Sequence, residues 1–109
     1  MGKFEINTDT SDKYRFNLKA TNGQVILSSQ GYTTKSACEN GIASVKKNAQ
    51  DDAMFERNTA KDGSPFFNLK SSNGQVIGTS EMYSSTSAME TGIASVKSNA
   101  PDAAIVDNS

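Results

Sequence analysis

The side chains best suited to binding a partner alternate along two similar segments, YRFNLK at residues 14–19 and PFFNLK at residues 65–70. This period of two is typical of a half-buried strand with its aromatic side inward. The residues expected to point away from the core are Arg15, Asn17, Lys19, Phe66, Asn68 and Lys70. Amide and charged groups can hold a ligand, and an outward aromatic is favoured at interaction surfaces. We predict an interaction surface here, with an ordinary solvated sheet face as the alternative.

The sequence offers little of the equipment of an enzyme. It contains no histidine, the side chain most often used as a general base or metal ligand. Its single cysteine, Cys38, corresponds to Met89 in a repeat described below, which favours a core-filling role over a nucleophilic one. The adjacent Asp51 and Asp52 fall in a predicted loop without further metal ligands at suitable spacing. We therefore expect no catalytic, metal or cofactor site, and a protein that is not an enzyme.

Charge and hydropathy narrow the classes of partner. Eleven Lys and Arg residues balance twelve Asp and Glu residues, for a net charge of -1. Dense basic faces are what nucleic acids and anionic membranes require, so neither is an expected partner. The N-terminus lacks the apolar segment of a signal peptide, and no apolar run reaches membrane-spanning length. We expect a cytoplasmic monomer that binds a protein or a small polar ligand. Weak single-stranded nucleic-acid binding on the same face, or a purely structural or stress-related role, are the alternatives.

The chain is internally duplicated. Residues 4–54 align without gaps to residues 55–105, and more than half of the aligned positions are identical. The clearest matches are FNLKATNGQVI with FNLKSSNGQVI, and ENGIASVKKNA with ETGIASVKSNA. One repeat alone would bury too little surface to be stable, and two are too few for an open solenoid. We predict one pseudo-symmetric domain over residues 1–109, made of repeats at about 1–54 and 55–109.

Each repeat is predicted to contain three short strands, a helix and a further strand. In the first repeat the strands are expected at residues 4–6, 14–19 and 25–27, and the Asn-Gly pair at 22–23 predicts a type I′ hairpin turn. Hydroxyl residues at 33, 34 and 36 are typical helix N-caps, and apolar residues at 38, 42, 45 and 49 recur at helical spacing. The second repeat follows the same pattern, and Pro101 is expected to end its helix.

Two pairs of residues predict how each helix meets the sheet. Gly41 and Gly92 lie inside the predicted helices, where glycine costs roughly 1 kcal/mol relative to alanine. They predict a close contact between helix and sheet. Tyr32 and Tyr83 precede the helices, and we expect each to anchor the start of its helix, with the hydroxyl reaching water or backbone.

The predicted fold class is α+β. The strand near residue 55 ends the first repeat and begins the second, so the repeats are expected to share one antiparallel sheet. Helices on one face of such a sheet leave the other face open to solvent. The predicted interaction surface lies on that open face.

A recurring motif connects this sequence to a known family. It consists of N-G-Q-V-I, S-x-x-Y and G-I-x-S-V-K at residues 22–26, 29–32 and 41–46, with copies at 73–77, 80–83 and 92–97. This double motif closely resembles the YegP-like family of small bacterial proteins, over nearly the whole chain. The resemblance implies β(3)-α-β units joined in a single sheet, with their C-terminal strands exchanged between units. It implies no activity, cofactor or catalytic residue.

Overall fold

The computed structural model describes residues 2–109. The elements follow the order expected from the repeat. They are β1 (Lys3–Thr8), β2 (Tyr14–Lys19), β3 (Val25–Ser28), α1 (Lys35–Asn48), the 3-10 helix η1 (Asp52–Met54), β4 (Phe55–Thr59), β5 (Pro65–Lys70), β6 (Val76–Thr79), α2 (Thr86–Asn99) and β7 (Ala104–Asp107). Thr34 and Ser85 cap the two helices, because their side-chain hydroxyls accept hydrogen bonds from the N–H groups of Ala37 and Ala88.

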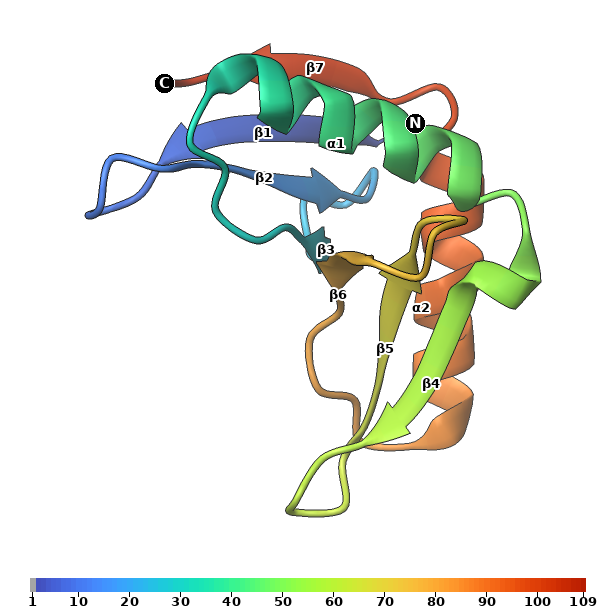
Figure 1. Ribbon diagram of the computed structural model, residues 1–109. Coiled ribbons are helices and arrows are strands. Elements are labelled where there is room, and N and C mark those ends of the chain that lie inside the picture. Colours follow the sequence, from blue (N-terminus) through green and yellow to red (C-terminus); the bar gives the residue numbers. More distant parts are fainter. Residues whose placement is uncertain (1) are drawn as a thin grey trace.

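Both repeats contribute to one seven-stranded sheet in the order β4-β5-β6-β3-β2-β1-β7. The α+β class and the shared sheet are thereby confirmed. In the middle of the sheet, β3 of the first repeat joins β6 of the second through one antiparallel pair, Ser28 with Thr79. The sheet is mixed rather than antiparallel throughout, because β7 runs parallel to β1, with Phe4 opposite Ile105. Since β7 belongs to the second repeat and β1 to the first, the C-terminal strand is exchanged at this end of the sheet (Figure 1).

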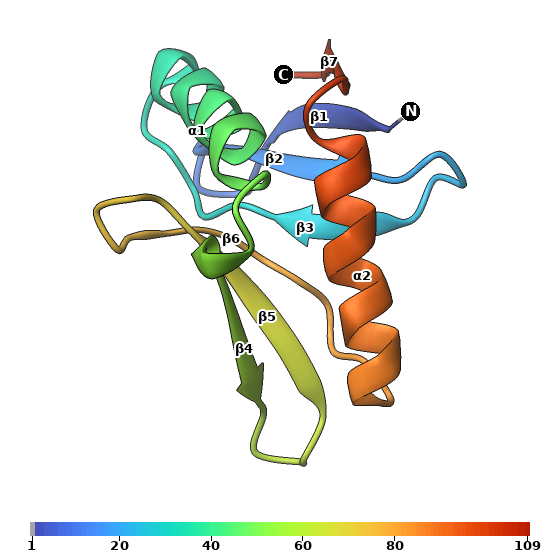
Figure 2. The ribbon, with the colours of Figure 1, turned by 90° about the vertical axis from the view of Figure 1, so that its right-hand side faces the viewer.

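The helices lie on one side of this sheet and enclose a single core (Figure 2). Alternate strand residues such as Phe16, Leu18, Phe67 and Leu69 have no exposed surface and pack with the apolar stripe of each helix. Helix α1 contacts β2 of its own repeat and also β5 and β6, while α2 contacts β5 and β3. Each helix therefore covers strands of both repeats, and this cross-packing holds the two halves together.

The hairpins form where Asn-Gly predicts them, but the predicted type I′ turn is wrong. A type I′ turn needs a positive φ at both central residues. Gly23 has φ 85°, whereas Asn22 is not among the residues with positive φ. The N–H of Gly23 donates to the carbonyl of Ala20, and the N–H of Ala20 donates to the carbonyl of Gln24, which gives a three-residue loop. The Asn22 side chain accepts from the Gln24 N–H instead, so asparagine serves as a local hydrogen-bond acceptor.

The close approach predicted at the helix glycines is present, but its nearest partner is the tyrosine before each helix rather than the sheet. A Cβ atom at Gly41 would collide with the Tyr32 hydroxyl, and one at Gly92 would collide with the Tyr83 hydroxyl. Tyr32 stacks on Phe16 with ring centroids 6.3 Å apart, and the second repeat has the same contact. Each tyrosine is thus held between a core phenylalanine and a helix backbone that glycine keeps open.

Candidate binding surface on the open sheet face

The six residues of the predicted interaction surface lie on the face of the sheet opposite the core. Their strand neighbours Phe16, Leu18, Phe67 and Leu69 are fully buried on the helix side. Arg15 is exposed and the other five are partly buried. The orientation inferred from the alternation is therefore confirmed. Whether this face binds a partner stays a prediction.

A polar row crosses this face from strand to strand. Register places six side chains on neighbouring strands, three from each repeat, with hydroxyl groups in the middle and carboxylates at the ends. In spatial order they are Glu5, Asn17, Ser28, Thr79, Asn68 and Glu56. The repeat thus produces a palindromic row about the β3–β6 junction.

In the second repeat this row is internally hydrogen-bonded. The Thr79 hydroxyl donates to Asn68 Oδ1 at 2.8 Å, and Asn68 Nδ2 donates to Glu56 Oε1 at 3.2 Å. Asn58 also donates to Glu56 Oε1, and Lys70 forms an ion pair with Glu56 at 2.7 Å. Lys70, followed by the two amides, lowers the pKa of Glu56 to about 2. In this half of the row, Thr79, Asn68 and Glu56 are hydrogen-bonded to one another.

In the first repeat the equivalent hydrogen-bonded network does not form. Glu5 forms ion pairs with Lys19 at 2.9 Å and Lys3 at 3.2 Å, and these lysines lower its pKa. Within residues 2–109, the side chains of Asn7, Asn17 and Ser28 make no hydrogen bond of their own. Lys3 offers a reason: its position corresponds to Met54 in the second repeat, where no second lysine competes for the carboxylate.

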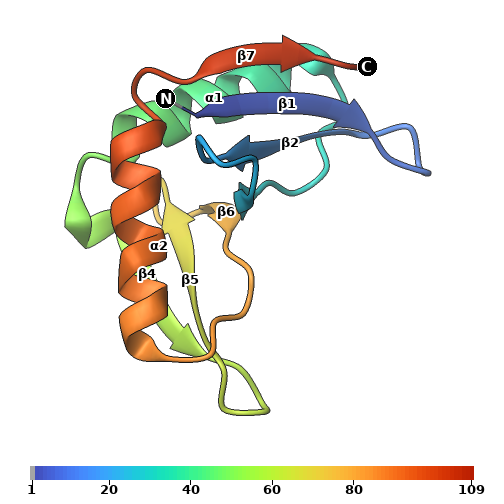
Figure 3. The same ribbon diagram turned by 180° about the vertical axis from the view of Figure 1, so that it is seen from behind.

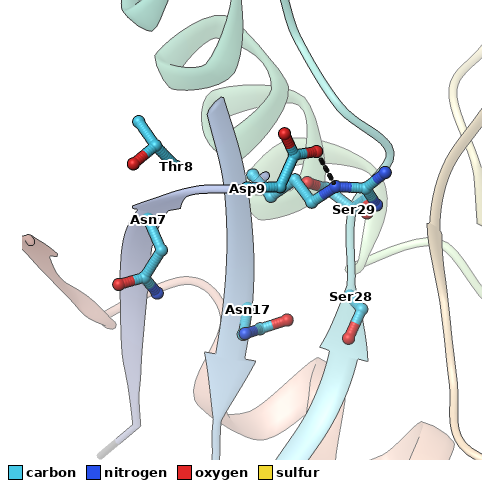
Figure 4. Close-up of a pocket in the computed structure, with 7 residues that line it drawn as sticks. Asn7, Thr8, Asp9, Asn17, Ser28 and Ser29 are labelled. Atoms are coloured by element: carbon cyan, nitrogen blue, oxygen red, sulfur yellow. Dashed lines mark hydrogen bonds and ion pairs between the residues drawn. The ribbon is translucent and has the colours of Figure 1, made fainter. Parts of the chain in front are cut away.

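These unpaired groups line a shallow hollow of about 240 Å³. Figure 4 shows Asn7, Asn17 and Ser28 on three neighbouring strands, with an ion pair at one margin. The lining residues are Asn7, Thr8, Asp9, Arg15, Asn17, Ser28 and Ser29. Arg15 Nε donates to Asp9 Oδ2 at 2.7 Å, and this contact first, then the Lys13 N–H, lowers the pKa of Asp9 to about 2. In the second repeat Ala60 and Phe66 replace this ion pair.

Residues 2–109 contain neither a metal-binding cluster nor a membrane-spanning helix. Within residues 2–109, no three His, Cys, Asp or Glu side chains are grouped so that they could hold a metal ion. In the same residues, no helix has the length and apolar character needed to cross a bilayer. Cys38 is buried, and burial raises the pKa of its thiol.

Comparison with known proteins decides the family. Both repeats match the domain of unknown function DUF1508, at residues 9–56 and 60–107. The chain belongs to the UPF0339 family. It is 58% identical over 107 residues to a UPF0339 protein of Bordetella pertussis, covering 98% of this chain and 96% of the relative. It is 46% identical to UPF0339 protein YegP of Escherichia coli K12, covering 98% and 97%.

Solved structures agree with this assignment to the UPF0339 family. The solution NMR structure of yegP from E. coli, described as a protein of unknown function, has a TM-score of 0.94 at 46% identity. It matches over 98% of this chain and 92% of that chain. A UPF0339 protein from Shewanella oneidensis gives a TM-score of 0.92 at 47% identity, over 97% and 90%. The predicted YegP-like membership is confirmed, and with it the tandem repeat.

The UPF0339 motif residues have structural roles in this chain. Ser29 Oγ accepts from the Phe16 N–H at 2.9 Å and donates to the Gln30 carbonyl at 2.8 Å. Ser80 makes the same two contacts in the second repeat. Each serine thus satisfies a strand N–H where regular pairing ends. These motif serines therefore maintain the fold, and Ser29 also lines the hollow.

The structure separates the six residues of the surface predicted from sequence, and it adds five residues that line the hollow: Asn7, Thr8, Asp9, Ser28 and Ser29. Arg15 and Asn17 line the hollow, whereas Lys19 is paired with Glu5. Asn68 and Lys70 belong to the satisfied network. Strand alternation could have placed Asn7 and Ser28 on the open face. No sequence signal shows that their side chains lack partners.

Proposed function

We propose that this protein is a non-enzymatic binding module that uses the open face of its sheet, centred on the hollow in the first repeat. Its ligand is a small polar molecule that presents both hydrogen-bond donors and acceptors. The observation that carries the proposal is the contrast within the polar row. Asn7, Asn17 and Ser28 have no side-chain partner within residues 2–109, while Asn58, Asn68 and Thr79 are all hydrogen-bonded.

The chemistry of the hollow supports an amide-like ligand. Each asparagine offers one carbonyl acceptor and two N–H donors, and the serine hydroxyl can do both. Asp9 holds Arg15 through Nε, and Arg15 Nη2 makes no hydrogen bond within the described chain. Partly buried polar groups without internal partners gain when a ligand supplies complementary hydrogen bonds. A compact amide fits this combination of groups.

The charge distribution weighs against the nucleic-acid alternative. Single-stranded nucleic acids need unpaired cations and several stacking aromatics. On this face Lys19 and Lys70 are each paired with a glutamate, at 2.9 and 2.7 Å. Phe66 is the one aromatic on the predicted surface.

A two-dimensional NMR titration of the protein with N-acetylglycinamide and with free glutamine tests this proposal. We expect the side-chain NH₂ signals of Asn7 and Asn17 to shift on addition of at least one probe. Those of Asn58 and Asn68 should stay in place, because their hydrogen bonds are already made. The proposal fails if the hollow is silent to both probes, or if the two repeats respond equally.

Variants sharpen the assignment to the hollow. Asn17→Ala should weaken probe binding roughly five- to tenfold, as expected for about 1 kcal/mol of lost hydrogen bonding. Asn68→Ala is the matched control and should leave binding unchanged. Lys3→Met should also weaken binding, although Lys3 does not line the hollow, because it frees Glu5 to accept hydrogen bonds from the first-repeat asparagines.

A further inference from the structure

The two repeats differ in what lies along their first strands. In the first repeat, β7 lies along the outer edge of β1, and the Asn108 N–H donates to the Ile6 carbonyl at 2.8 Å (Figure 3). In the second repeat, β4 is the equivalent strand and stands at the end of the sheet. Within residues 2–109 no strand pairs with its outer edge.

The chain connectivity explains this difference. After α2, the chain continues into β7, which reaches across to β1 of the other repeat. After α1, the corresponding segment runs through η1 directly into β4, which pairs with β5. The first repeat therefore uses its returning strand as the first strand of the second. No segment remains to flank β4, and an eighth strand position stays open.

The edge of β4 is nearly a copy of the edge that receives β7. Residues 4–7 read FEIN and residues 55–58 read FERN, so Arg57 in place of Ile6 is the one difference. Ile6 has no exposed surface, whereas the Arg57 side chain is 34% exposed. Backbone groups alternate in direction along a strand. The carbonyl of Phe55 and the N–H and carbonyl of Arg57 therefore point away from β5, as the equivalent groups of β1 point toward β7.

An ion-pair cluster holds Arg57 at this edge. Its Nε donates to Glu90 Oε2 at 2.6 Å and its Nη2 donates to Asp52 Oδ1 at 3.1 Å. Lys97 also contacts Asp52, at 2.6 Å. The cluster ties β4 to α2 and η1. A charged side chain on an edge strand opposes the addition of another strand, because the incoming strand would have to desolvate it.

We propose that the outer edge of β4 is a second acceptor site for the C-terminal strand β7 of another copy of this chain, and that Arg57 keeps it closed. The occupant follows from β1, whose edge takes this strand within the molecule. The incoming strand would run parallel to β4, with Ile105 beside Phe55 and Asp107 beside residue 57, as β7 does on β1. Arg57 thereby limits the sheet to seven strands.

The peptide of residues 102–109 is a direct probe of this edge. It is added to the full-length protein and to the variant R57I, which makes residues 55–58 identical to residues 4–7. In R57I we expect the backbone N–H signal of residue 57 to shift and to exchange more slowly with solvent. The apparent affinity of R57I for the peptide should be at least tenfold higher than that of the unchanged protein.

Three controls keep the result decisive. The variant R57K retains the charge and should stay closed to the peptide. A peptide with Val106→Pro lacks an N–H that would face β4, and it should not bind. If R57I does not fold, as judged by its remaining NMR signals, R57V takes its place. The proposal is overturned if a folded variant does not bind the peptide. It is also overturned if unchanged protein binds as tightly, or if the peptide displaces β7 from β1 instead.

Discussion

Asn17 and Asn68 occupy equivalent positions on β2 and β5, face the same side of the sheet and follow identical core phenylalanines. Asn68 joins a hydrogen-bonded chain from Thr79 to Glu56, whereas the Asn17 side chain has no partner within residues 2–109. The residues that set this contrast lie elsewhere in the chain. Lys3 draws Glu5 away from the asparagines in the first repeat, and Met54 cannot do so in the second. Identical residues in a repeat thus acquire different chemistry from their neighbours.

The sheet edges show the same effect. Ile6 and Arg57 are equivalent positions on β1 and β4. Within residues 2–109, only β1 of these two strands has a further strand along its outer edge, and β1 carries the buried apolar residue. The core does not follow this pattern, because both halves bury the same aromatic contacts. Divergence between the repeats therefore bears on the open face and the edges, where the surroundings differ.

The largest expected effect tests the equivalence of the two cores. Phe16→Ala and Phe67→Ala should each lower the free energy of unfolding by about 3–5 kcal/mol, because both rings are fully buried. The costs should be similar, since each ring makes an edge contact at 5.7 or 5.6 Å and a stacked contact at 6.3 Å. Urea unfolding of the two variants measures this. A difference above about 2 kcal/mol would show that the halves are packed unequally.

A smaller effect should separate the two halves of the polar row. Asn68→Ala should lower the free energy of unfolding by about 1 kcal/mol, because the alanine leaves Thr79 and Glu56 without a hydrogen-bond partner. Asn17→Ala should change it by less than about 0.5 kcal/mol, since no internal hydrogen bond is lost. The same urea experiment compares them. Equal losses would mean that Asn17 is engaged after all.

The smallest expected effect is on the stability of the fold at low pH. The pKa of Glu56 is about 2 in the folded protein, against its usual 4.5. A lowered pKa means that the native carboxylate contributes stability above pH 4.5, which is lost as the pH falls through about 2. Glu56→Gln should therefore flatten the loss of stability over this range. NMR titration of the Glu56 carboxyl measures its midpoint, and a value near 4.5 would contradict the network.

Much of the fold follows from the residue pattern. Alternation along residues 14–19 and 65–70 identifies the buried and open faces, because a strand reverses its side chains at every residue. Apolar spacing and hydroxyl caps locate the helices, and the duplication predicts a shared sheet. Local backbone detail was less accessible. The Asn-Gly pairs predict type I′ turns, but the first hairpin has a three-residue loop. The length of this loop follows from the hydrogen bond between Ala20 and Gln24, which depends on the register of the hairpin.

The repeated residues, their secondary structure and the side of the sheet they face are local properties, and short-range spacing encodes them. Pairing is different, because it depends on which distant segments become neighbours. β7 pairs with the edge of β1, although the two strands lie near opposite ends of the sequence. Lys3 and Lys19 both reach Glu5 only when β1 and β2 are paired in register. Those long-range contacts leave the side chains of Asn7, Asn17 and Ser28 without a partner within residues 2–109, and they cover the edge of β1 but not that of β4.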